Sequence, residues 1–160
     1  MLLQEKYPHE DISYLVKLLT ITSQNVDISS NITFFKRLIE NEGIVEKRHP
    51  FSMDQIQRIK NGEEPSGPKI HQYYSAIMGD PNAVTVDTWI ARVFGIERKA
   101  KRKEKTVTSS LGPLDHLFCW YYIRSQAPTY GLTPAEMTIM LRRGIRIANK
   151  QPLKDYDYYL

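Results

Sequence analysis

The sequence predicts an all-α protein that forms a single compact domain of about six to eight helices over residues 1–160. Apolar residues recur at helical spacing in most segments that lie between turn signals. Several of these segments open with a proline or a capping-box pattern, both of which favour a helix start. Strand-like alternation is confined to residues 84–86, which is too short for a strand.

The first half of the chain contains four predicted helices. The first places apolar residues at i, i+3, i+4 and i+7 over residues 12–19 and ends near residues 20–23. The second begins at Asp27 or Ser29, which are good N-caps, and ends at Gly43.

The third helix starts in the pattern Ser52-x-x-Gln55 and is broken after Asn61 by glycine and proline. The fourth begins at Pro68 and ends at Gly79. Its predicted buried face consists of Ile70, Tyr73 and Ile77.

The second half predicts three more helices. One begins around Asp87 and stops at Gly95, and the next follows Pro113. The last opens in the capping box Thr133-Pro134-Ala135-Glu136. The predicted apolar face of the helix after Pro113 consists of Leu114, Leu117, Phe118 and Tyr121, and that of the last helix of Met137, Met140, Leu141 and Ile145.

The composition indicates a cytoplasmic protein without a membrane span. The longest apolar run, residues 117–123, is seven residues long, far short of a bilayer. The single cysteine, Cys119, lies within that run, so we expect a buried structural thiol and no disulfide. We expect no metal site and no cofactor, because the four histidines are scattered and phosphate-loop motifs are absent.

Positive charge is concentrated in two places, although the net charge is only +4. Residues 98–105 carry six cations and one anion, and Arg142, Arg143 and Arg146 form a second cluster. Either cluster is a solvated face or a set of phosphate contacts. Residues 97–112 are predicted to form a basic surface loop, and residues 155–160 a frayed tail.

Two segments carry a resemblance to a known family. Residues 66–70 read Ser-Gly-Pro-Lys-Ile, and residues 86–93 read Val-Asp-Thr-Trp-Ile-Ala-Arg-Val, with Lys69 and Asp87 eighteen positions apart. Upstream, residues 22–31 read Thr-Ser-Gln-Asn-Val-Asp-Ile-Ser-Ser-Asn. Together these segments resemble the helix-hairpin-helix DNA glycosylases of the endonuclease III type. Within that superfamily, the chain is similar to a compact, divergent member of the kind encoded by phages or mobile elements.

The resemblance implies a helix-hairpin-helix element and a set of roles. Lys69 stands at the position of the nucleophile that attacks the sugar and forms a Schiff base, and Asp87 at that of the carboxylate that stabilises the positive sugar. Gln24 stands at the position of the residue that fills the gap left by an extruded base. The predicted DNA contacts are Gln24, Asn25, Gly67, Trp89, Arg92, Arg98, Lys99, Lys101, Arg102 and Lys103.

The chain also departs from the family pattern. Pro65 replaces the first hairpin glycine, and Trp89 replaces the usual histidine. Only 45 residues separate Gln24 from Lys69, which is fewer than in typical members, and the iron–sulfur cysteines are absent. Asp87 is alternatively a plain helix cap, and Trp89 is more simply a core or lid aromatic than a base-stacking residue.

Three functions therefore remain open. The first is a DNA glycosylase with possible lyase activity. The second is a base-hypermodification enzyme of phage type, similar to the alpha-glutamyl/putrescinyl thymine pyrophosphorylases. The third is a DNA-binding module that keeps the fold without catalysis. All three take DNA as partner, and the oligomeric state is left undetermined.

Overall fold

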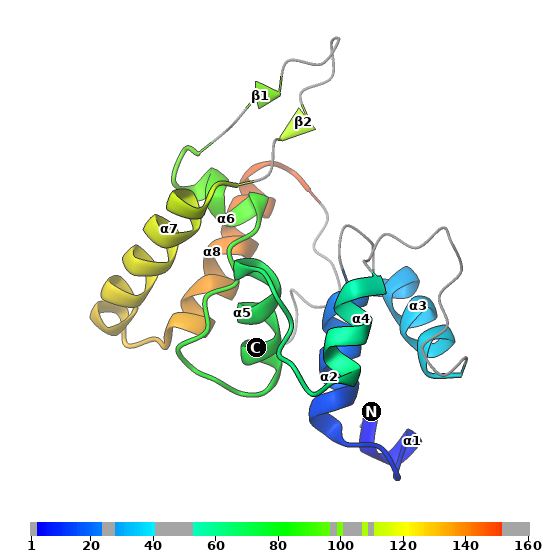
Figure 1. The fold of residues 1–160 in the computed structure, drawn as a ribbon. Helices are drawn as coiled ribbons and strands as arrows, with labels where there is room; N and C mark the ends of the chain where they lie inside the picture. Colours follow the sequence, from blue (N-terminus) through cyan, green and yellow to red (C-terminus); the bar gives the residue numbers. More distant parts are fainter. Residues whose placement is uncertain are drawn as a thin grey trace. The chain divides into compact units, whose positions relative to one another are not determined.

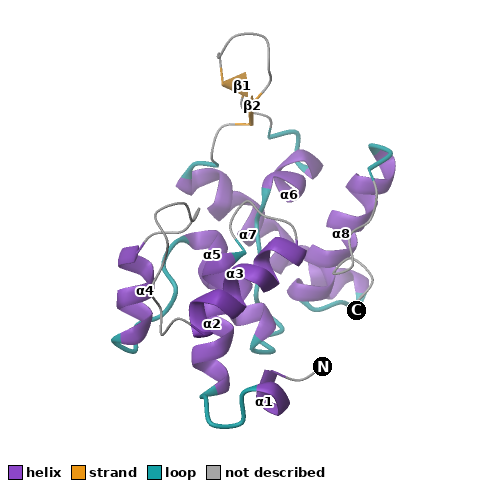
Figure 2. Ribbon diagram, turned by 90° about the vertical axis from the view of Figure 1, so that its right-hand side faces the viewer, coloured by secondary structure: helices purple, strands orange, loops and turns teal. Residues whose placement is uncertain are grey.

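The computed structural model describes residues 3–23, 28–40, 53–96, 99–100, 107–108 and 111–151. The predicted all-α class is confirmed: this part of the chain contains eight α-helices, one 3-10 helix and a two-stranded pairing (Figure 1; Figure 2). Contacts along the chain divide it into two compact units, residues 1–78 and 79–160. Each unit has its own cluster of buried apolar side chains.

The first unit contains five helices. They are α1 (Leu3–Lys6), α2 (Ile12–Thr22), α3 (Ile28–Glu40), α4 (Met53–Lys60) and α5 (Pro68–Ile77). The sequence predicted four of them and missed the four-residue α1. The carboxylate of Asp11 caps α2 by accepting hydrogen bonds from the backbone N–H groups of Ser13 and Tyr14.

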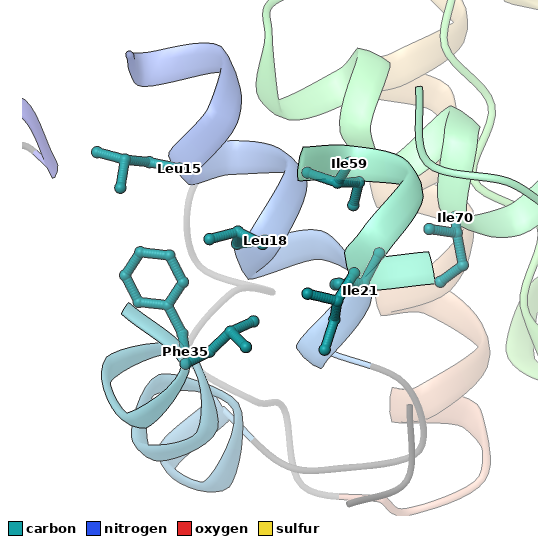
Figure 3. Packing of buried hydrophobic residues seen from close by; sticks show 8 residues of the cluster. Leu15, Leu18, Ile21, Phe35, Ile59 and Ile70 are labelled. Atoms are coloured by element: carbon teal, nitrogen blue, oxygen red, sulfur yellow. The ribbon is translucent and has the colours of Figure 1, made fainter. Parts of the chain in front are cut away.

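Helix α2 is the centre of this unit, and it contacts α3, α4 and α5. Figure 3 shows Leu15, Leu18 and Ile21 of α2 facing Phe35 of α3, Ile59 of α4 and Ile70 of α5. These side chains are at most 8% exposed. Burial of such residues stabilises a domain by roughly 1.5–3 kcal/mol per side chain, so this cluster holds α4 and α5 against α2.

The second unit contains α6 (Thr88–Val93), α7 (Pro113–Gln126), a 3-10 helix η1 (Ala127–Tyr130) and α8 (Pro134–Ala148). The predicted starts at Asp87 and Pro113 and the capping box of Thr133 and Glu136 are all observed. Helix α8 packs on α6 and on α7. The core is formed by Val84, Val86, Ile90, Cys119, Ile123, Ala127 and Met137.

The apolar face of α7 that the sequence singled out is not the face that enters the core. Cys119 and Ile123, on the other side of the helix, enter the core. The residues of the singled-out face are exposed: Leu114, Leu117, Phe118 and Tyr121. Both sides of α7 are apolar, so helical periodicity alone did not distinguish the side that the fold buries.

Two smaller expectations are also corrected. Ile70 is buried as predicted, but Ile77 in the same helix is 39% exposed, and Met140 of α8 is 50% exposed. Within the predicted loop 97–112, β1 (Lys99–Ala100) pairs antiparallel with β2 (Val107–Thr108), and Lys99 lies opposite Thr108. The predicted frayed tail, 155–160, lies outside the described residues.

None of the helices in the described ranges is both long enough and apolar enough to cross a bilayer.

Candidate nucleic-acid site

The first candidate region is the hairpin between α4 and α5, in the first unit. Helix α4 ends in a tight turn in which the N–H of Gly62, at φ +87°, donates to the carbonyl of Ile59. Pro65, at the position of the missing hairpin glycine, is buried. Gly67 then takes φ +97°, and Pro68 starts α5. The two positive-φ glycines turn the chain by a conformation that other residues adopt only with strain.

The acidic residues of this hairpin are both paired with cations. Arg58 of α4 bonds Glu63 at 2.8 Å, and Lys17 of α2 lies 3.3 Å from Glu64. The Lys17 amine also donates to the carbonyl of Gly62 and lies 5.9 Å from the centre of the Tyr74 ring. Lys17 is largely buried, and its bonds attach the α4–α5 connection to α2. Its positive charge also offsets the negative charge of Glu64, which would otherwise repel a phosphate.

Lys69 lies in the first turn of α5. It is half-buried next to Ile70, which anchors the helix in the core. Within the described ranges, no hydrogen bond or ion pair occupies its amine. The N-cap residue, Gly67, has no side chain with which to satisfy the first N–H groups of the helix. Helix α5 therefore begins with N–H donors that no side chain caps and with a lysine amine that has no partner among the described residues.

Asp87, in the second unit, caps the start of α6 and is 8% exposed. Its Oδ1 accepts hydrogen bonds from the backbone N–H groups of Trp89, at 2.9 Å, and Ile90, at 3.0 Å. Its Oδ2 lies 3.1 Å from a guanidinium nitrogen of Arg142 in α8. Both carboxylate oxygens are thus engaged, and the side chain joins α6 to α8 as well as capping α6.

Trp89 and Arg92, both predicted to contact DNA, lie beside this group. The guanidinium of Arg92 lies 4.4 Å from the centre of the Trp89 ring, and that of Arg146 lies 5.4 Å away. Arg146 is only 3% exposed. Cations over the ring compete with a stacked base for it. The geometry therefore favours the structural role of Trp89 that the sequence also suggested.

Arg142 and Arg146 are the residues whose role the sequence did not identify. They were grouped as a solvated face or as phosphate contacts, whereas one pairs with Asp87 and the other is buried over Trp89. The usable signal was their spacing of four in the last helix, which places them on one side of it. No sequence rule showed that this side faces α6.

The remaining predicted contacts cannot be placed in this site. Gln24 and Asn25 lie outside the described residues, as do Arg98, Lys101, Arg102 and Lys103. Lys99 belongs to β1, and its side chain is also outside the described set. Of the predicted site residues whose side chains the structure describes, Gly67 and Lys69 belong to the first unit, and Asp87, Trp89 and Arg92 to the second.

Cys119 is the buried thiol that the sequence predicted, with 0% exposure. Burial, and to a smaller extent the nearby carboxylate of Asp115, raises the pKa of this thiol to about 11. A thiol with that pKa stays protonated at neutral pH, so Cys119 is not a nucleophile there.

These observations define an all-helical protein with a glycine hairpin and an arginine-held helix cap. The chain belongs to a family of unknown function, DUF7178, whose model matches residues 23–140. Neither the curated proteins nor the solved structures contain a match. The matched range includes the hairpin together with Asp87, Trp89 and Arg92, whereas Arg142 and Arg146 lie just beyond its end.

Proposed function

We propose that this protein binds DNA through the α4–α5 hairpin and acts on an extruded base, as a DNA glycosylase with Lys69 as its nucleophile. The observation that carries the proposal is the start of α5. There a positive-φ glycine, unsatisfied backbone N–H groups and the amine of Lys69 occur within three residues. Such a helix start favours a phosphate, and the amine adds a second interaction with it or reaches the sugar.

The charges around the hairpin support a DNA partner. Glu63 and Glu64 would repel phosphates if they were unpaired, but each lies within ion-pair distance of a cation. Lys69, in the first turn of α5, has no acidic partner within the described ranges, so its positive charge is not offset by a neighbouring carboxylate there. DNA binding of this kind weakens as salt rises, because each phosphate contact releases a counterion.

The proposed chemistry uses the free amine. The Lys69 nitrogen forms a bond to the anomeric carbon while the glycosidic C–N bond breaks, and the base leaves with the electron pair and takes up a proton. Loss of a proton from the amine and opening of the sugar ring then give an iminium. The step uses Lys69 alone, because both oxygens of Asp87 are already engaged by backbone N–H groups and by Arg142.

One observation favours a second candidate, a DNA-binding module without catalysis. The carboxylate of Asp87 is 8% exposed and fully occupied in holding α6 and α8 together. A purely structural Asp87 needs no chemical role, and Lys69 then serves only as a phosphate contact.

Borohydride trapping separates the two candidates. Duplex DNA with an abasic site is incubated with the protein and borohydride, and covalent complexes are counted on a denaturing gel. The glycosylase proposal predicts a trapped complex that Lys69→Gln abolishes. The matched control is Lys36→Gln, which removes an exposed lysine of α3 and should leave trapping intact.

Salt-dependent binding is measured in parallel. Binding without any trapping would overturn the catalytic proposal and leave the non-catalytic module. Absence of both would overturn DNA as the partner.

A further inference from the structure

The most exposed apolar surface in the described part of the chain lies on α7. Five of its side chains project from one face at helical spacing: Leu114 (78% exposed), Leu117 (59%), Phe118 (53%), Tyr121 (70%) and Tyr122 (43%). We call this set the α7 stripe. A helix that is apolar on both sides is normally covered on both sides, and only the side of Cys119 and Ile123 enters the core.

The stripe is held in place by the fold. Phe94, the C-cap residue of α6, packs edge-on against two rings of α7. Its ring centre lies 5.6 Å from that of Phe118 and 5.1 Å from that of Tyr122. At the other end, the carboxylate of Asp115 accepts a hydrogen bond from the N–H of Gly112 and fixes the first turn. A preorganised surface loses less conformational entropy when a partner covers it.

We propose that the α7 stripe is a homodimer interface, in which two copies of this chain pack α7 against α7 in antiparallel orientation. The proposal goes beyond DNA binding and does not depend on it. Its basis is the order of four stripe residues, Leu117, Phe118, Tyr121 and Tyr122, which is symmetric about the point between Cys119 and Trp120.

That symmetry lets the stripe pack against itself. In an antiparallel pair centred on this point, Phe118 lies level with Tyr121 of the other copy, and Leu117 lies level with Tyr122. At these levels the interface is filled by one apolar side chain from each copy, whereas Leu114 lies level with Ser125. A two-fold interface requires this kind of self-complementarity.

The charges of α7 fit the same orientation. Asp115 is in the first turn and Arg124 in the last turn, equally far from the centre of symmetry. Antiparallel packing places the acidic end of each helix at the level of the basic end of the other, and it also opposes the two helix dipoles. Parallel packing would bring like charges to the same level.

The size of the stripe fits a reversible dimer. Exposed leucine and aromatic side chains offer on the order of 600 Å² per copy, somewhat below the roughly 800 Å² per partner of a standard stable interface. We therefore expect a micromolar dissociation constant. The stripe is a poor DNA surface, because it contains no lysine or arginine.

Sedimentation equilibrium of the full chain, from low micromolar to several hundred micromolar, tests the proposal. Wild-type protein should pass from monomer to dimer, and Tyr121→Glu should raise the dissociation constant by about 100-fold, since a symmetric dimer carries the change twice. The matched control is Tyr130→Glu in η1, because Tyr130 is 68% exposed and lies outside the stripe. It should leave the dimer unchanged.

Both tyrosines are at the surface, so circular dichroism and melting temperature should be unchanged in either variant. A wild-type monomer at all concentrations, or equal effects of the two variants, would overturn the proposal. Higher oligomers that survive Tyr121→Glu would overturn it as well.

Cross-linking then tests the orientation. A short bismaleimide should join Leu114→Cys to Ser125→Cys when the two variants are mixed, because these positions are level in the antiparallel pair. Neither variant should cross-link efficiently alone, since its own two copies lie about 16 Å apart along the axis. The native Cys119 is 0% exposed and adds little background. Cross-linking of each variant alone, with no product joining Leu114→Cys to Ser125→Cys in the mixture, would indicate parallel packing and overturn the proposal.

Discussion

Lys69, in the first unit, is half-buried and lies at a helix start that no side chain caps, whereas the carboxylate of Asp87, in the second, is buried and engaged through both oxygens. The resemblance to the glycosylases paired these two residues as one catalytic group. Because their surroundings differ, the two side chains can play different roles. Lys69 is available to a ligand, and Asp87 holds secondary structure together whether or not it also acts in chemistry.

The largest expected effect follows from removing the Asp87 carboxylate. Asp87→Ala deletes a helix cap and the buried ion pair with Arg142, so we expect a loss of about 3 kcal/mol in the unfolding free energy. Asp87→Asn keeps an acceptor for the two N–H groups and should cost about half as much.

Urea unfolding followed by tryptophan fluorescence measures this loss. Both tryptophans, Trp89 and Trp120, belong to the second unit, so the signal reports on that unit. A stability within about 0.5 kcal/mol of the wild type for Asp87→Ala would show that the cap and ion pair are dispensable and would remove the contrast with Lys69.

A smaller effect is expected at the hairpin. Gly67→Ala introduces a side chain at φ +97° with no atom within 4 Å of the new Cβ, so the cost is backbone strain of about 1–2 kcal/mol. Gly144→Ala is the control, because that glycine lies inside α8 without a positive φ and without a neighbour within 4 Å. It should raise stability by up to about 1 kcal/mol. Thermal unfolding by circular dichroism measures both, and equal signs for the two variants would contradict the strained-hairpin interpretation.

Lys69→Gln should scarcely change stability, by less than about 0.5 kcal/mol, because no contact of its amine is lost within the described residues. The same variant should lose borohydride trapping. Stability and trapping therefore separate the two residues: Lys69→Gln should affect trapping, and Asp87→Ala should lower stability. A large destabilisation by Lys69→Gln would mean that the lysine is also structural.

The smallest effect concerns the exposed capping box of α8, which contrasts with the buried cap of α6. Hydrogen bonds from the backbone N–H and hydroxyl of Thr133 lower the pKa of Glu136 below its ordinary value of 4.5. The contribution of Glu136 to the free energy of unfolding is therefore present above pH 4.5 and is lost as the pH falls through the lower folded-state pKa. Melting temperatures of wild type and Glu136→Gln should converge between neutral pH and pH 3, and a constant difference would contradict this linkage.

Much of the fold was predictable because its signals are local. Helical periodicity, Asp87 before α6, proline at the starts of α5 and α7, and the capping box of α8 each act within a few residues. The short α1 was missed because four residues are too few to show a period. The candidate site was predictable only as a list of residues, since spacing along the chain does not report which atoms are already bonded.

By itself, the sequence determined the all-α class, most helix boundaries, the buried state of Cys119 and the glycine turn before Lys69. Only the tertiary structure decided which side of α7 is buried, because both sides are apolar and the contacts of Ile123 and Cys119 with other elements select one. It also decided that Arg142 neutralises Asp87. Both outcomes depend on contacts between segments distant in sequence, whose free energy no local pattern contains.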